Sequence, residues 1–313
     1  LRPQDGGPVT VPTQDMVLGS YYLTFDRFEN GVSQLDNDEF WPSNVDFSLA
    51  GKSLSELTDE ERANTHLNVY RDEDEAMLAF KDHLIGTHQP IRVRVEKELP
   101  DGTMGHKIVD TTIGRILFNQ VVPEEVGYIN TVLTKKSLRD IIAVVMKKAG
   151  ADKVAAFLDD IKNMGYRMAF QGGLSFNLDA VIIPEEKLVQ EGYDRSDAIM
   201  EDYNMGLITN NERYNQIIDV WTNINTKLTK VVIDTLVKDQ DGFNPVYMML
   251  DSGARGSKEQ IRQLSGMRGL MAKPQKSGVE GGQQVIENPI LSNFKEGLSV
   301  LEYFVSTHGA RKG

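Results

Sequence analysis

The residue types best suited to chemistry gather between positions 251 and 276, where basic side chains outnumber acidic ones. The basic residues there are Arg255, Lys258, Arg262, Arg268, Lys273 and Lys276, and the acidic ones are Asp251 and Glu259. Arginine presents paired N–H donors that match phosphate oxygens, and lysine meets phosphate as a point charge. The segment is therefore a candidate phosphate-binding surface. Taken alone, it is equally consistent with the solvated start of a basic helix that Ser257 caps.

Residues 253–258 (GARGSK) contain the glycines, the hydroxyl group and the lysine of a nucleotide-binding loop, but in a different order. A P-loop has the spacing GxxxxGK[ST] and follows a buried strand, whereas no clear buried strand precedes this run. A P-loop enzyme is thus an alternative that the spacing disfavours. It would require the chain to bind ATP by itself.

Other catalytic and metal-binding patterns find no support in the sequence. The five histidines lack metal-ligand spacing, and the absence of cysteine excludes thiolate zinc sites and disulfides. Residues 239–242 (DQDG) begin like a calcium loop, but Leu250 stands where the chelating glutamate belongs. No Ser/His/Asp or Cys/His arrangement is recognisable. We therefore predict no catalytic residue, no metal ligand and no cofactor in this chain.

The overall composition narrows the class of protein. The net charge of -12 argues against a chain whose whole surface binds nucleic acid, so the basic segment is an island in an acidic protein. No apolar run is long enough to span a membrane, and the first residues lack the order of a signal peptide. We expect a cytoplasmic protein. The chain opens without methionine and closes in mid-pattern on residues 310–313, so we expect a piece of a longer protein.

The elements that must position the basic segment belong to an α+β fold. Alternation of apolar and charged residues predicts a strand over residues 91–95, and a second strand is expected over 107–118. Apolar residues at helical spacing predict a helix over 138–149 that ends at Gly150 and another over 154–164 that ends at Gly165. Together these segments predict a small α+β unit.

A long antiparallel helical hairpin is expected next. Pro184 opens its first helix, residues 204–208 form the turn, and Thr209 with Glu212 forms a capping box for the second helix. Each helix should contain roughly 20 to 25 residues. Apolar side chains lie on one stripe at three- and four-residue spacing: Ile217, Ile218, Trp221, Ile224, Leu228, Val231, Val232 and Leu236. The tyrosines and Trp221 of the hairpin could stack on bases, but packing between the helices is the favoured interpretation.

Several longer stretches resemble the largest subunit (β′) of bacterial RNA polymerases. The most specific are YMMLDSGARGS at 247–257, QIRQL at 260–264 and GMRGLMAKP at 266–274. Further stretches that resemble the family in the same order are VPTQDMVLG at 11–19, DTTIGR at 110–115, VIIP at 181–184, ERYN at 212–215, IDVW at 218–221, NFKEGL at 293–298 and STHGARKG at 306–313. The resemblance spans nearly the whole chain, and residues 26–90 match poorly.

The resemblance implies a role for each segment. The hairpin would form the rim of the secondary channel through which NTPs reach the active site, with regulators docking at its tip. Arg255 would guide the incoming triphosphate, and Arg262, expected two helical turns further on near the same face, would support it. The remaining implied sites are the docking tip (Glu212, Arg213, Asn215, Asp219), the cap of the bridge helix (Arg268, Lys273) and hinges within that helix (Gly309, Gly313).

The same resemblance divides the chain into five segments: 1–25 after the catalytic aspartate loop, 26–180 as the pore and funnel region, 181–238 as the rim hairpin, 239–290 as the basic segment and cap, and 291–313 as the first half of the bridge helix. The loop that holds catalytic magnesium would precede Leu1, so the chain alone would be inactive. Implied partners are the beta, alpha, omega and sigma subunits, transcript cleavage factors, NTP, template DNA and RNA, at the nucleoid. The alternative is a free-standing regulatory scaffold that binds partners through its hairpin.

Overall fold

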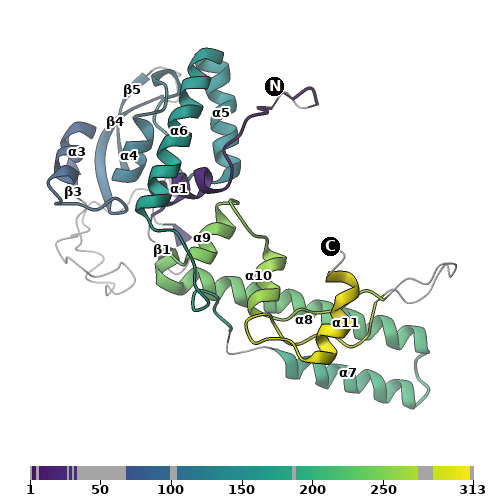
Figure 1. Cartoon of the computed structure of the whole chain (residues 1–313). Coiled ribbons are helices and arrows are strands. Elements are labelled where there is room, and N and C mark those ends of the chain that lie inside the picture. Colours follow the sequence, from purple (N-terminus) through teal and green to yellow (C-terminus); the bar gives the residue numbers. More distant parts are fainter. Residues whose placement is uncertain are drawn as a thin grey trace. The chain divides into compact units, whose positions relative to one another are not determined.

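The computed structural model describes residues 2–4, 7–26, 28–29, 32–33, 68–98, 104–184, 188–273 and 285–310. The chain forms two compact units, each built from two separate stretches: Leu1–Ser175 with Val237–Arg255, and Phe176–Leu236 with Gly256–Gly313 (Figure 1). The α+β fold class is confirmed, because a small sheet accompanies a predominance of helix. Among the described helices, none has the length and apolar character needed to cross a membrane.

The first unit contains a three-stranded sheet in the order β3-β4-β5. Its strands are β3 (Asn68–Tyr70), β4 (Pro90–Glu98) and β5 (Met104–Thr112), with β3 parallel and β5 antiparallel to β4. The predicted alternation is confirmed, because Ile91, Val93 and Val95 are buried. Helix α3 (Glu73–Lys81) covers these residues with Ala76 and Ala79, so one face of the sheet belongs to a core.

The strand predicted over residues 107–118 is wrong beyond Thr112. Helix α4 (Ile113–Asn119) begins there, and the Thr112 hydroxyl accepts a hydrogen bond from the Arg115 amide at 3.3 Å. Such a cap satisfies one of the unpaired N–H groups at a helix start. Since Ile113, Ile116 and Phe118 are all buried, their apolar run continues unbroken from strand into helix. Periodicity alone does not separate the two for a run this short.

Helices α1 (Asp15–Thr24), α5 (Lys135–Ala149) and α6 (Ala151–Gln171) build the main core of the first unit (Figure 1). The break at Gly150 is confirmed, with φ of 83°. The predicted end at Gly165 is wrong, because α6 continues for six residues beyond it. A Cβ atom on Gly19 of α1 would lie 1.8 Å from the Gly165 carbonyl oxygen. Gly165 therefore permits a close helix crossing and does not end the helix.

Shorter elements complete the first unit. They are β1 (Phe28–Glu29), which pairs with β2 (Val32–Ser33), the 3-10 turns η2 (Glu124–Val126) and η3 (Asp239–Gly242), and helix α9 (Pro245–Asp251). The interpretation of residues 239–242 as a turn is confirmed by η3. At the centre, the Arg115 guanidinium meets the Asp26 carboxylate at 3.3 Å with both side chains fully buried. It also donates to the carbonyl oxygens of Thr24 and Asn130, so one side chain joins three segments.

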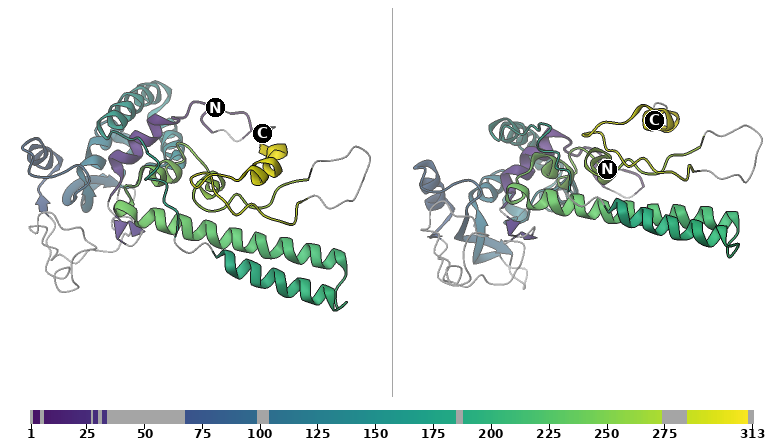
Figure 2. Two further views of the ribbon diagram at one scale, coloured as in Figure 1. Left: turned by 60° about the horizontal axis from the view of Figure 1, so that its bottom comes forward. Right: turned by 90° about the horizontal axis from the view of Figure 1, so that it is seen from below.

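The second unit is built on the predicted helical hairpin, whose helices lie side by side in both views of Figure 2. Helix α7 (Val189–Asn204) has 16 residues and α8 (Asn210–Lys238) has 29, so the expectation of two similar helices is wrong. The predicted start at Pro184 is wrong as well, because α7 begins after Leu188, which adopts a left-handed conformation with φ of 52°. The turn is confirmed, with Gly206 at φ of 76°.

The apolar stripe of the hairpin is largely confirmed. Its buried members on α8 are Ile217, Trp221, Ile224, Leu228, Val232 and Leu236. Gly192 of α7 faces this stripe, since a Cβ atom there would lie 2.7 Å from the Trp221 ring. The stripe therefore packs α7 and α8 together.

The rest of the second unit lies beyond the basic segment. Helix α10 (Lys258–Ser265) begins at a capping box formed by Ser257 and Gln260, which confirms the cap expected at Ser257. After it, Gly269 pairs with Ile290 and Ala272 with Val285 in two antiparallel bridges, which we call the paired segment (residues 269–272 and 285–290). Helix α11 (Val300–Ala310) follows. The basic segment is thus divided between the two units at Arg255 and Gly256.

Candidate functional site

Arg255 lies in the turn that follows α9. Gly253, with φ of 70°, and Gly256, with φ of 84°, provide the left-handed conformations that this turn requires. The Arg255 amide donates to the Met249 carbonyl oxygen at 3.2 Å. Its side chain is exposed, and in the part of the chain that the structure describes its guanidinium makes no hydrogen bond or ion pair. A fixed backbone thus carries a guanidinium whose donors are available to a ligand.

Two further residues, Tyr21 and Lys135, hold this turn, and neither was predicted from the sequence. The Tyr21 hydroxyl donates to Asp251 Oδ2 at 2.7 Å, from helix α1 to the end of α9. The Lys135 amide donates to the Ser252 carbonyl oxygen at 2.9 Å. Both contacts join residues more than a hundred positions apart, so no local pattern in the sequence could have indicated them.

Arg262 has a different environment. The side chain is 8% exposed, and each nitrogen of its guanidinium donates at least one hydrogen bond. Nε and Nη2 donate to Glu259 Oε2 at 2.9 and 2.7 Å, and Nη1 donates to Asn225 Oδ1 at 3.0 Å and to the carbonyl oxygens of Met267 and Arg268. The expected helical relation to Arg255 is wrong, because α10 begins only at Lys258. Arg262 fastens α10 to α8 and to the following turn.

Arg268 and Lys273 each contact an aromatic ring. The Arg268 guanidinium lies 4.9 Å from the centre of the Phe294 ring, and the residue is 7% exposed. The Lys273 ammonium lies 5.8 Å from the centre of the Tyr214 ring. Cation–π contacts of this kind join the residues around the paired segment to α8 and to the segment that leads into α11.

The residues predicted at the hairpin tip divide into two groups. Glu212 accepts hydrogen bonds from the Thr209 amide and hydroxyl at 2.8 and 2.9 Å, which confirms the capping box and lowers the pKa of Glu212. Asn215 and Asp219 are exposed. Arg213 instead binds both oxygens of Glu287 at 2.8 and 3.0 Å, and its side chain is only 12% exposed. Arg213 therefore joins the tip to the paired segment.

The aromatic side chains of the hairpin pack, as the favoured interpretation predicted. The rings of Tyr193 and Trp221 meet edge to face at 5.6 Å between their centres. The Tyr214 hydroxyl donates to the Val285 carbonyl oxygen at 2.9 Å and accepts from the Val285 amide at 3.1 Å. Beyond these contacts, Met205 and Leu207 at the turn are 66% and 69% exposed. The tip thus presents an apolar surface beside acidic residues.

The predicted hinge residues fall at the end of the chain. Gly309 lies in the last turn of α11, and Gly313 lies outside the described residues. The apolar side chains of α11 are mostly exposed, with Val300, Leu301 and Phe304 the most open.

Comparison with known proteins assigns the chain to a family. The family described as RNA polymerase Rpb1, domain 3 matches residues 1–181, which is more than half of the chain, and RNA polymerase Rpb1, domain 4 matches residues 208–295. The chain belongs to the RNA polymerase Rpb1 family. Helices α8, α9 and α10 lie inside the domain 4 match, whereas α7 and α11 lie outside both matches.

Three relatives show how far the similarity extends. Each carries the name DNA-directed RNA polymerase subunit beta′ and aligns with 100% of this chain: 56% identical in Parabacteroides distasonis, 53% in Bacteroides fragilis and 53% in Flavobacterium johnsoniae. The chain covers 20% of each of these relatives, so it spans about a fifth of their length. The expected resemblance to the bacterial subunit is therefore confirmed over the whole chain.

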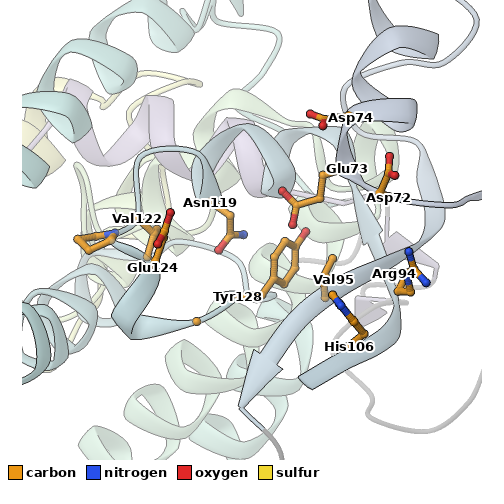
Figure 3. A pocket seen from close by; sticks show the side chains of 12 residues that line it. Asp72, Glu73, Asp74, Arg94, Val95, His106, Asn119, Val122, Glu124 and Tyr128 are labelled. Atoms are coloured by element: carbon orange, nitrogen blue, oxygen red, sulfur yellow. The ribbon is translucent and has the colours of Figure 1, made fainter. Parts of the chain in front are cut away.

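Within the Rpb1 domain 3 match, an open groove of about 390 Å³ lies between the sheet and η2 (Figure 3). It is lined by Asp72, Glu73, Asp74, Arg94, Val95, His106, Asn119, Val122, Pro123, Glu124, Gly127 and Tyr128. Glu73 and Tyr128 point toward one another in Figure 3, and the Tyr128 hydroxyl contacts the Thr111 hydroxyl at 2.8 Å. Burial raises the pKa of Tyr128, so its phenol stays protonated. Among the described residues that line this groove there is no serine, threonine, lysine or cysteine, and we assign it no reaction.

Across the residues that the structure describes, no three histidine or carboxylate side chains come together as a metal site would require. Among the predicted arginines, Arg255 is the one with an exposed guanidinium that makes no hydrogen bond or ion pair within the described part of the chain.

Proposed function

We propose that this chain is part of a DNA-directed RNA polymerase and forms the side by which NTPs enter. The observation that carries the proposal is the environment of Arg255, an exposed guanidinium without internal partners among the described residues, on a turn whose backbone is held at several points. Such a side chain can meet triphosphate oxygens in a paired geometry. The names of the relatives support the assignment to the polymerase.

The proposal has consequences for partners and location. The chain would work with the other polymerase subunits, with template DNA and RNA, and with a catalytic magnesium ion held by another part of the subunit. It would be inactive alone, and it would work in the cytoplasm at the nucleoid. The alternative of a free-standing scaffold has no relative among those named above to support it.

Arg255→Ala tests the role in NTP use. In a polymerase reconstituted with the full-length subunit that carries this chain, we expect kcat/KM for NTP to fall about tenfold or more, because a charge-assisted hydrogen bond to phosphate contributes roughly 1.5–3 kcal/mol. Arg71→Ala, which removes an exposed arginine elsewhere in the same unit, is the matched control and should leave elongation unchanged. Elongation kinetics that are unchanged by Arg255→Ala would contradict the proposed role of Arg255 in NTP use.

We further propose that transcript cleavage factors and similar regulators dock at the hairpin tip. Met205 and Leu207 are exposed at the turn, Glu212 caps the start of α8, and Asn215 and Asp219 are exposed further along that helix. A partner with a basic rim and an apolar centre would fit such a surface.

A double substitution, Met205→Ser with Leu207→Ser, should weaken regulator binding about tenfold and spare basal elongation, because neither side chain belongs to the buried stripe. Surface binding assays with the assembled polymerase measure the first effect, and transcription without regulator measures the second. The matched control is Glu191→Gln, which changes a charge at the other end of α7. Regulator affinity equal to that of the wild type would contradict the docking proposal.

A further inference from the structure

A directed contact from helix α1 holds the turn that carries Arg255. The Tyr21 hydroxyl donates to Asp251 Oδ2 at 2.7 Å, and Asp251 is the last residue of α9. A hydrogen bond to a carboxylate is stronger than one between neutral groups. Together with the apolar packing of Met248 against Leu18 and Tyr21, this bond ties α9 to α1.

Tyr21 is itself fixed in place. Its side chain is fully buried, and it packs with Leu18, Phe25 and Met248 in one apolar cluster. Its ring centre lies 5.1 Å from that of Phe25. Burial is the main cause that raises the pKa of Tyr21, and the nearby charge of Asp251 raises it further. The hydroxyl therefore remains protonated and donates its hydrogen at every physiological pH. The donor of this contact is therefore permanent and rigid.

The residues between Asp251 and Arg255 are also fixed, so the position of Asp251 determines that of the Arg255 backbone. The Ser252 carbonyl oxygen accepts from the Lys135 amide at 2.9 Å, and the Ala254 side chain packs against two apolar clusters. Only three residues separate Asp251 from Arg255, and the Arg255 amide donates to the Met249 carbonyl oxygen. A displacement of Asp251 would therefore move the Arg255 backbone with it.

We propose that Tyr21 and Asp251 are positioning residues that aim Arg255 at the incoming triphosphate. The inference rests on the proposed function of Arg255. Neither residue touches substrate; their effect is to hold the turn in the geometry that the guanidinium needs, since small misplacements of a binding group weaken catalysis strongly.

Tyr21→Phe is the decisive variant, measured in polymerase reconstituted with the full-length subunit. It removes one oxygen atom from a buried ring and leaves Asp251 free to be solvated. We expect KM for NTP to rise on the order of five- to tenfold with kcat changed less than about twofold. Asp251→Ala should reproduce this effect, whereas Asp251→Asn, which keeps an acceptor oxygen, should retain most of the wild-type affinity.

The matched control is Tyr22→Phe, the same chemical change one position along α1. The Tyr22 ring packs edge to face against His88, with 4.6 Å between ring centres, and its hydroxyl has no hydrogen-bond partner among the described residues. We expect its KM and kcat to equal those of the wild type. An equal rise in KM for Tyr22→Phe would show a general disturbance of α1 and overturn the inference.

A double-mutant cycle separates positioning from a structural role. In an Arg255→Ala background, Tyr21→Phe should cause no further rise in KM, because the group it positions is gone. A rise that persists in this background would overturn the inference. Normal KM for Tyr21→Phe and Asp251→Ala, together with a defect for Arg255→Ala, would overturn it and leave the proposed function intact. No defect for Arg255→Ala would remove the proposed function and the inference with it.

Discussion

At the scale of single residues, Arg262 shows how one guanidinium joins three parts of a unit. Its donors reach Glu259 within α10, Asn225 on α8 and two carbonyl oxygens of the following turn. A planar fork of five N–H groups can satisfy acceptors in several directions at once, whereas an ammonium group cannot. The positive charge of Arg262 therefore serves the stability of the second unit.

Arg262→Lys should lower the free energy of unfolding of the second unit by about 2–4 kcal/mol, because acceptors in a largely buried site lose their donors. The variant keeps the charge, so a loss of this size points to geometry. Urea unfolding followed by Trp221 fluorescence measures it in a Trp41→Phe background, since the chain has two tryptophans. Arg195→Lys, on the exposed side of α7, is the control and should change stability little. Equal losses for both variants would contradict the assignment.

The burial and the hydrogen-bond partners of the site residues were the features that could be predicted least well from the sequence. Arg255 and Arg262 belong to one basic segment, and the local pattern located that segment and its cap at Ser257 correctly. The pattern could not separate the exposed arginine from the buried one, because the partner that distinguishes Arg262 is Asn225, 37 positions away. The same limit concealed the bond between Tyr21 and Asp251, which are 230 positions apart.

At the scale of elements, the hairpin and the paired segment form one assembly within the second unit. Arg213 binds Glu287 in a forked ion pair, and Tyr214 exchanges two hydrogen bonds with Val285. The start of α8 thus holds the second half of the paired segment (residues 285–290), which leads toward α11. A partner that bound at the tip and displaced Arg213 would act on the paired segment as well.

This ion pair should make the second unit sensitive to acid. The hydrogen bond from Arg213 lowers the pKa of Glu287 in the folded chain, so the pair stabilises above the ordinary glutamate pKa of about 4.3 and this contribution is lost as pH falls through the lowered value. Glu287→Gln should reduce stability at pH 7 by about 1 kcal/mol, with a difference from wild type that shrinks below about pH 4.

Urea unfolding of the two proteins at neutral and acid pH measures this difference. Glu191→Gln is the control, because its ion pairs with Arg195 and Lys227 involve more exposed side chains, and it should lose less stability. A constant difference between Glu287→Gln and the wild type at all pH values would contradict the role of the carboxylate charge.

Elements with strong local signals were predicted well. The capping box at Thr209, the cap at Ser257 and the stripe of α8 depend on residues within one or two turns, and the structure confirms them. Gly165 was misjudged because a glycine after an apolar stretch often ends a helix. Its actual neighbour is Gly19, 146 positions earlier in the chain, which lies across a close helix crossing.

At the scale of the whole molecule, the two units have separate apolar cores although each uses two stretches of the chain. The main core of the first unit draws on α1, α5 and α6, while the stripe of α8 belongs to the second unit. Because the residues of that cluster and those of the stripe each belong to one unit, we expect each unit to unfold in its own cooperative step.

Gly19→Ala tests this independence. Alanine favours helix by about 1 kcal/mol over glycine, but its Cβ atom would meet the backbone of Gly165 at 1.8 Å, so we expect the first unit to lose more than about 2 kcal/mol. In a Trp41→Phe background, hydrogen exchange of α5 and α6 amides should accelerate while the unfolding midpoint reported by Trp221 stays unchanged. Gly86→Ala, where a Cβ atom would meet nothing within 4 Å, is the matched control and should leave both signals unaltered. Should the Trp221 midpoint fall together with the protection of α5 and α6, the two cores form one cooperative unit and the separation argued from their composition is wrong.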